Sequence, residues 1–194
     1  MKITISTKIA RLAGTALAAL ALMGSALTAE AAAFMKLGDI KGEATDNAHK
    51  DWIIIQSISQ SIVRGEGLTG QSRRRGDVIM EDIVCVKELD KSSPKLAESV
   101  CTGKVFPKVE IEMTATYTNA DGTDGRVTYY TYELTNVMVT SYTISGSAQG
   151  AEVPTEQFSL NFEEIRVIYT KQGDAAGNGG GNVEYTWKVE EGTK

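Results

Sequence analysis

Few side chains in this 194-residue chain could do acid–base or metal chemistry, and His49 is its single histidine. His49 lies between Asp46 and Asp51 in a polar loop before Trp52. A metal site would need further nitrogen or sulfur ligands, and both cysteines are far along the chain. A nucleophile–histidine pair would have to be built on His49, yet the sequence holds no nucleophile-elbow motif. The pattern favours a loop histidine that donates a hydrogen bond to the backbone.

The other candidate motifs do not complete a catalytic or cofactor site. The glycine cluster at residues 177–181 lacks the Gly-Lys-Ser/Thr ending of a phosphate-binding loop and does not open a helix. The carboxylates of residues 163–164 and 190–191 are adjacent, so they point to opposite faces of a strand and do not suit paired acid–base work. We therefore expect no enzyme activity, no cofactor and no metal ion. A secreted hydrolase would have to use His49 as its water-activating group.

Cys85 and Cys101 are the only two cysteines, and they flank the turn between an expected strand and an expected helix. If these elements are antiparallel, their lengths allow the two sulfurs to meet. A disulfide is permitted in an exported protein and would contribute roughly 3 kcal/mol for a loop of this size. The alternative is two small buried thiols, one on each element. The residues leave both possibilities open.

Residues 1–33 have the pattern of a secretory signal peptide, with a basic start and an apolar run from Leu12 to Leu27. Two small-x-small cleavage patterns end at Ala31 and at Ala33. We expect one mature domain, residues 34–194, exported from a Gram-negative bacterium to the periplasm or beyond, with no membrane association after removal of the signal.

The expected mature domain is acidic. Loss of residues 1–33 removes three basic residues and one acidic residue, which leaves 17 Lys+Arg against 24 Asp+Glu and a net charge of −7. Neutralising phosphates needs a basic patch, so this balance argues against nucleic acid as a partner. The one basic run, residues 73–75, has no interleaved aromatic residue and is interpreted as a solvated loop tip.

One helix is expected after residue 92. Ser93 fits the N-cap, Pro94 the first helical position, and Gly103 the left-handed stop. A narrow apolar stripe at i,i+4 spacing consists of Leu96, Ala97, Val100 and Cys101.

Most of the remaining chain reads as strand, which predicts a barrel or a sandwich. In the segment 52–63 the even positions are expected to share one face, and in 158–170 a β-bulge near residues 163–164 would restore one apolar face. The expected strands are Phe34–Ile40, Trp52–Val63, Val78–Lys87, Val105–Tyr117, Arg126–Leu134, Val137–Ile144, Phe158–Thr170 and Val183–Val189.

Three stretches resemble the tube protein of bacterial type VI secretion, the haemolysin-coregulated protein (Hcp) family. KELDKSSPKLAESVCTGK at 87–104 resembles the segment around that family's helix. FMKLGDIKGEATDNAHKDWI at 34–53 resembles its opening strand and loop. FSLNFEEIRVIYT and GNGGGNVEYTW, within 158–187, resemble its closing pair of strands. The stretches occur in the family's order and span about residues 33–190.

The resemblance implies a mainly β fold, a closed antiparallel β-barrel of two sheets with one flanking helix, in a homo-hexameric ring that stacks into a tube. Its implied partners are a VgrG-type spike, a contractile sheath and effector proteins carried as cargo. Residues expected to matter for the ring or its stacking are His49, Lys50, Trp52, Glu88, Leu89, Asp90 and Lys91.

The signal peptide departs from this family's pattern, because tube subunits leave the cell through the secretion apparatus itself. The alternative function is an exported, periplasmic or extracellular oligomeric binding module that keeps the Hcp fold and has no injection role.

Overall fold

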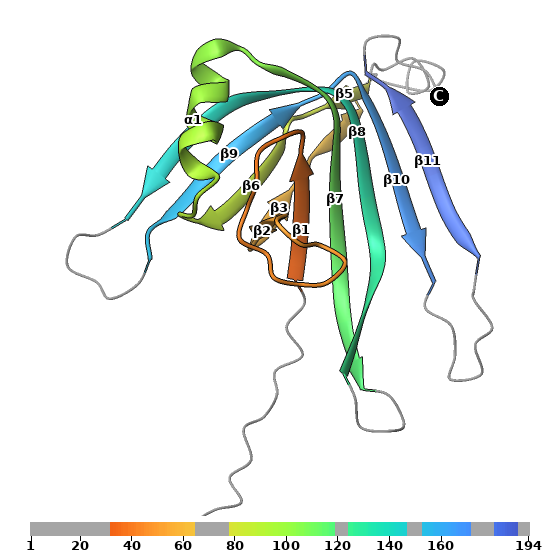
Figure 1. Cartoon of the computed structure of the whole chain (residues 1–194). Helices are drawn as coiled ribbons and strands as arrows, with labels where there is room; N and C mark the ends of the chain where they lie inside the picture. The colour runs from red at the N-terminus through yellow and green to blue at the C-terminus, as the bar shows by residue number, and fades with distance from the viewer. Residues whose placement is uncertain (1–31, 65–77, 119–123, 147–152, 172–180, 190–194) are drawn as a thin grey trace, which may run out of the picture.

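The computed structural model describes residues 32–64, 78–118, 124–146, 153–171 and 181–189, and these form a mainly β molecule with one helix (Figure 1). Residues 1–31 of the expected signal peptide, the basic run at 73–75 and most of the glycine cluster lie outside the described residues. The elements are β1 (Ala32–Leu37), β2 (Ile53–Ile55), β3 (Ser57–Ser59), β4 (Ile62–Arg64), β5 (Val78–Met80), β6 (Ile83–Glu88), α1 (Ser93–Thr102), β7 (Val105–Thr118), β8 (Asp124–Ser145), β9 (Thr155–Asn161), β10 (Glu164–Thr170) and β11 (Asn182–Lys188).

The main sheet has nine strands among the described residues, in the order β2-β1-β7-β8-β9-β6-β3, with β10 between β8 and β11. Every pair in it is antiparallel, as expected. The closed barrel of two sheets that was expected is not shown by these pairings, in which β2 pairs with β1 at one end of the path and β3 pairs with β6 at the other. The two strands follow one another along the chain on either side of Gln56, whose amide donates to the Val86 carbonyl oxygen at 2.8 Å. The second sheet is the separate two-stranded pair β4–β5.

Strand β8 is the longest element, with 22 residues, where two shorter strands were expected. The two halves are joined through Asn136, which has a positive φ of 50°. One side of β8 pairs with β7, and the other side pairs first with β10 and then with β9. The break between β9 and β10 at residues 162–163 keeps Phe158, Leu160, Ile165 and Val167 all buried, which confirms the expected change of phase.

In the segment 52–63 the even positions were expected to form the apolar face, but the buried isoleucines are at odd positions. Ile53 and Ile55 are buried, whereas Ile54 and Ile62 are exposed. Apolar residues occupy both odd and even positions in this segment, so the alternation alone could not show which face is buried.

Helix α1 confirms the expected C-cap, since Gly103 has φ 63° in the left-handed region. The N-cap is Ser92 instead of Ser93, and its side chain makes no capping hydrogen bond. The buried positions of α1 are Ser93, Leu96 and Ser99, so the stripe is rotated from the expected one. Within the described residues, no helix is long and apolar enough to cross a membrane.

The apolar core is made mainly by side chains from the strands of the curved main sheet. The strand residues in it include Ile83 and Cys85 of β6, Ile111 of β7 and Leu134 of β8, and Leu96 is its fully buried helical member. On the outer face, Glu133 of β8 accepts from Lys108 at 3.3 Å and from Arg166 at 2.9 Å. Arg166 also donates to Glu184 of β11 at 2.6 Å. This line of charges crosses four adjacent strands.

Candidate functional site

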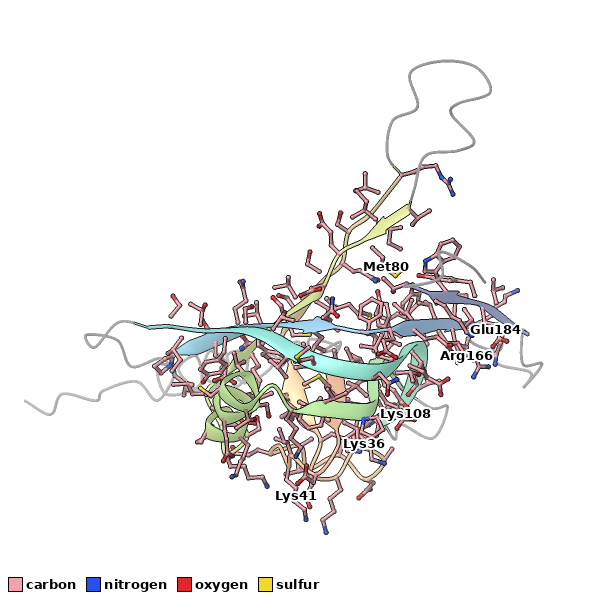
Figure 2. All side chains as sticks on the ribbon, turned by 90° about the horizontal axis from the view of Figure 1, so that it is seen from above. Lys36, Lys41, Met80, Lys108, Arg166 and Glu184 are labelled. Atoms are coloured by element: carbon pink, nitrogen blue, oxygen red, sulfur yellow. The ribbon has the colours of Figure 1, made fainter. Side chains whose placement is uncertain are left out.

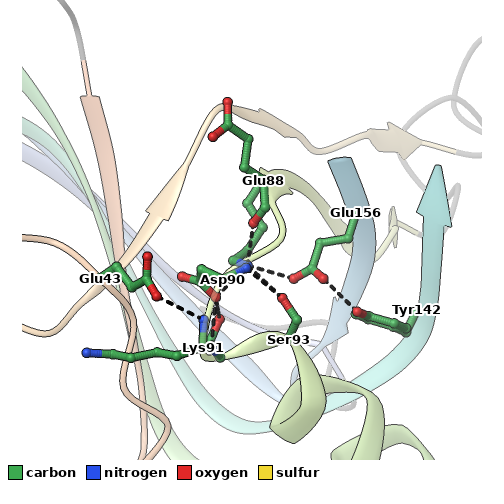
Figure 3. A network of polar contacts seen from close by, with 9 residues as sticks. Glu43, Glu88, Asp90, Lys91, Ser93, Tyr142 and Glu156 are labelled. Carbon is green, nitrogen blue, oxygen red and sulfur yellow. Dashed lines mark hydrogen bonds and ion pairs between the residues drawn. The ribbon is translucent and has the colours of Figure 1, made fainter. Parts of the chain in front are cut away.

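The turn between β6 and α1 is built on a buried lysine. Alternate residues of β6 are buried, first Ile83, then Cys85 and then Lys87. The side chain of Lys87 is 1% exposed. Its Nζ donates to Glu156 Oε1 at 2.7 Å, to Asp90 Oδ1 at 2.8 Å and to the Glu88 carbonyl at 2.7 Å (Figure 3). An ammonium group removed from water needs such partners, because burying it unpaired would cost several kcal/mol.

Glu156 is the buried counter-charge of Lys87. It comes from β9, and its side chain is fully buried. Its second oxygen, Oε2, accepts from the Tyr142 hydroxyl at 2.6 Å. Burial and this hydrogen bond to a carboxylate raise the pKa of Tyr142 to about 12. The network therefore ties β6, β8 and β9 together below the helix.

Asp90 shapes the turn itself. Its Oδ1 accepts from the Ser92 amide at 2.8 Å and from the Ser92 hydroxyl at 2.5 Å, while its own amide donates to Ser93 Oγ at 3.0 Å. These bonds explain why Ser92 and not Ser93 precedes the helix. Ser93 Oγ is engaged by Asp90 instead of capping the first turn, and the Ser92 hydroxyl donates to Asp90.

The loop 38–52 is fixed by His49, which is buried. Its Nδ1 lies 2.8 Å from Asp46 Oδ1 and its Nε2 lies 2.9 Å from Glu112 Oε2 on β7. The ring stacks on Phe34 with centroids 4.3 Å apart and meets the edge of Trp52 at 5.0 Å. The expected hydrogen bond from the His49 ring to the backbone is replaced by contacts with two carboxylates.

The hydrogen bonds of His49 also act on Asp46. Burial opposes ionisation of this carboxyl group, but hydrogen bonds from the His49 ring and the Ala48 amide hold the pKa of Asp46 below its ordinary value. The loop returns closely over the start of β2, where a Cβ on Gly42 would lie 2.3 Å from the Trp52 carbonyl oxygen. Only glycine fits that approach.

The structure brings the two predicted contact segments together. The Lys91 amide donates to Glu43 Oε1 at 3.3 Å (Figure 3). Lys91 Nζ lies 3.5 Å from Asp51 Oδ1. Among the predicted residues, Lys50, Glu88 and Lys91 are exposed, Trp52, Leu89 and Asp90 are half-buried, and His49 is buried.

Lys87, Glu156 and Tyr142 are the site residues that the sequence analysis missed. The alternation along β6 could have placed Lys87 inside, but nothing in the sequence links it to a carboxylate on β9. Lys87 donates to Asp90 and Glu156, and Tyr142 donates to Glu156, so these buried groups fix the turn before α1 to the sheet. Among the residues with described positions, no group of three or more His, Cys, Asp or Glu side chains could hold a metal ion.

The two cysteines are free thiols and do not form the disulfide that the sequence allowed. Cys85 points into the core from β6, and Cys101 lies on the exposed side of α1. The rotation of the helical stripe explains the difference, because it turns Cys101 toward solvent. Burial raises the pKa of the Cys85 thiol to about 12.

Comparison with known proteins gives one consistent relationship. A protein-family model described as "Type VI secretion system effector, Hcp" matches residues 34–169. The protein hcp1 of Pseudomonas aeruginosa is 29% identical over 159 residues, which cover 81% of this chain and 94% of that protein.

Solved structures agree with this relationship. One described as a type six secretion system protein aligns with a TM-score of 0.73 and 26% identity, over 84% of this chain and 99% of its own. Hcp1 from Salmonella typhimurium aligns with a TM-score of 0.65 and 23% identity, over 84% of this chain and 97% of its own. A type VI secretion system effector from Yersinia pestis has a TM-score of 0.60 at 22% identity, over 81% of this chain and 99% of its own.

Proposed function

This chain belongs to the Hcp family of type VI secretion proteins, and from that membership we propose that it is a structural subunit of the secretion tube. In this proposal six copies form a ring, and rings stack into the inner tube that is expelled with its effectors. The observation that carries it is the family match over residues 34–169, together with the nearly complete coverage of the related chains. The Hcp family is a structural family and not a family of enzymes.

The surface where loop 38–52 meets the turn before α1 is proposed to contact neighbouring copies. Lys50, Trp52, Glu88, Leu89 and Lys91 present side chains there that are exposed or half-buried. His49 and Asp90 support this surface from inside, through Glu112 and through Lys87. A surface held by buried ionic hydrogen bonds keeps one geometry, which a repeated contact between identical subunits requires.

The partners proposed for the assembled tube are those of the family, namely a VgrG-type spike at its tip, a contractile sheath around it and effector proteins as cargo. The sequence of residues 1–33 favours a second candidate, an exported oligomeric binding module of the same fold with no injection role. The two proposals share the oligomer and differ in the route by which the protein leaves the cell.

Light scattering and negative-stain microscopy of the purified chain test the oligomer. The expected result is a particle with the mass of six subunits and the shape of a ring, and a monomer at high concentration would refute the tube proposal. Release of the protein from cells with and without the sheath then separates the two routes. Release that requires the sheath supports the tube, whereas release without it supports the exported module.

A further inference from the structure

Strands β4 and β5 form an arm that projects away from the main sheet (Figure 2). The register pairs Ile62 with Met80 and Val63 with Ile79. Only Met80 packs against the core from this arm, and it lies at the base of the arm. Ile62, Val63 and Ile79 are all exposed, with Ile79 at 56%.

Both faces of the arm are apolar. Ile62 points to one face, and the cross-strand pair Val63–Ile79 points to the other. A two-stranded ribbon is marginal in water by itself, and exposed apolar area costs about 25 cal/mol per Å². An apolar ribbon that projects from the molecule therefore indicates a contact that this chain does not make with its own described residues.

A second apolar surface lies at the far end of β10 and β11. Tyr169 pairs with Val183, and Val167 pairs with Tyr185, so all four side chains share one face of the sheet. Val167 is buried in the core, but Tyr169, Val183 and Tyr185 are exposed, with Val183 at 71%. The core-facing side of the sheet thus continues past the core, and none of the described residues covers it there. In addition, β11 pairs only with β10 among the described strands, which makes it an edge strand.

We propose that the β4–β5 arm of one copy packs on the Tyr169–Val183–Tyr185 surface of a second copy. This inference rests on the proposed ring and names its contact. The sizes of the two surfaces are compatible. The three-residue strands of the arm span about 10 Å. The Tyr169–Val183–Tyr185 surface extends about 7 Å along β11 and about 5 Å across its two strands.

The partner is a second copy because one chain cannot join its own two surfaces. Figure 1 places β5 near the upper ends of the strands, whereas β11 starts at the lower end. A contact between two different surfaces of identical subunits is heterologous, and such contacts generate rings when the rotation closes. The described part of the arm carries aliphatic side chains apart from Arg64 at the end of β4, and the receiving surface is aromatic and aliphatic, so the contact between them would be mainly apolar.

Cysteine cross-linking tests the contact directly. In a Cys101→Ser background, one preparation carries Ile79→Cys and another carries Val183→Cys. The expected result is that mild oxidation of the mixture gives disulfide-linked dimers containing one chain of each kind. Neither preparation alone should give them. The matched control replaces Ile79→Cys with Ile144→Cys, because Ile144 is also 56% exposed but lies outside both surfaces. Equal cross-linking by the control, or no mixed dimer with Ile79→Cys, would overturn the proposal.

Charge substitution gives the second readout. Ile79→Glu should raise the concentration needed for assembly by about tenfold or more, because a carboxylate would be buried against Val183 or Tyr169, whereas Ile144→Glu should not. Both variants should remain folded by circular dichroism, since both sites are exposed. Rings of unchanged stability in Ile79→Glu would refute the arm contact and leave the proposed function standing. Mixed dimers between the Ile79→Cys and Val183→Cys chains, together with a wild-type protein that forms no six-membered ring, would do the reverse.

Discussion

The Nζ atom of Lys91 lies 3.5 Å from Oδ1 of Asp51, and this ion pair joins two segments that are far apart in the sequence. The pair is partly exposed, so its own contribution to stability is small. Its importance is positional, because with the bond from the Lys91 amide to Glu43 it makes the loop 38–52 and the turn before α1 one surface. A change in either segment should therefore alter the other.

Loss of the buried ammonium should destabilise the fold strongly. Lys87→Met leaves Glu156 and Asp90 without their cation, and the expected loss is about 3–5 kcal/mol in the free energy of unfolding, measured by urea denaturation. The control is Lys95→Met, since Lys95 is 65% exposed and pairs with Glu98 on the helix surface. The double variant Lys87→Met/Glu156→Met should recover part of the loss. Similar losses for Lys87→Met and Lys95→Met would contradict this account.

The charge line across the sheet should make stability depend on pH. Burial opposes ionisation of Glu133, but hydrogen bonds from Arg166 and Lys108 hold its pKa below the ordinary value. A lowered pKa in the folded state stabilises the protein above the unfolded-state pKa, about 4.3, and this stabilisation is lost as the pH falls through the folded-state pKa. The difference in unfolding free energy between wild type and Glu133→Gln should be about 1 kcal/mol or less near pH 7 and should vanish in acid. A difference that grows as the pH falls would have the wrong sign.

The thiols should react at very different rates. Cys101 is exposed and should react with Ellman's reagent in the native protein, whereas Cys85 should react only after unfolding, because burial raises its pKa to about 12. The expected titration is one thiol in buffer and two in denaturant without reductant. No reactive thiol in denaturant would mean that the purified protein contains the disulfide.

If the proposed signal peptide is removed, the position of the new N-terminus should affect stability. In β1, Ala32 pairs with Thr114, and Ala33 pairs with both Met113 and Ile55. A chain that starts at Ala32 keeps these ladder positions, while one that starts at Phe34 loses them. We expect the 32–194 chain to be more stable than the 34–194 chain by about 1–2 kcal/mol in urea unfolding. Equal stability would show that the two alanines add nothing to the strand.

The sequence was sufficient for the helix, the strand-rich class and the break near residue 163, because each has a local cause. Pro94 and Gly103 bracket the helix, and the change of parity after Phe162 requires an irregular residue. The buried network was not predictable in the same way. Lys87 looks like a surface residue, and its partners Glu156 and Tyr142 become neighbours only when β6, β8 and β9 pair.

The contacts of His49 also could not be predicted fully from the sequence. Its neighbour Asp46 is local, but Glu112 is 63 residues away on β7 and could not be inferred from spacing. The prediction of the apolar face around Ile54 was wrong for another reason. Isoleucines at 53, 54 and 55 fit either face, and only the pairing with β1 decides that 53 and 55 turn inward.

The length of β8 has a mechanical consequence. Its 22 residues form one covalent run with a contour of about 70 Å, hydrogen-bonded to β7, β9 and β10 along its course. A load applied along this strand would have to shear many ladder bonds at once, whereas a load across it would peel them one after another. A subunit that is pushed along the direction of β8 should therefore behave as a stiff strut, and force applied across that direction should unfold it much more easily.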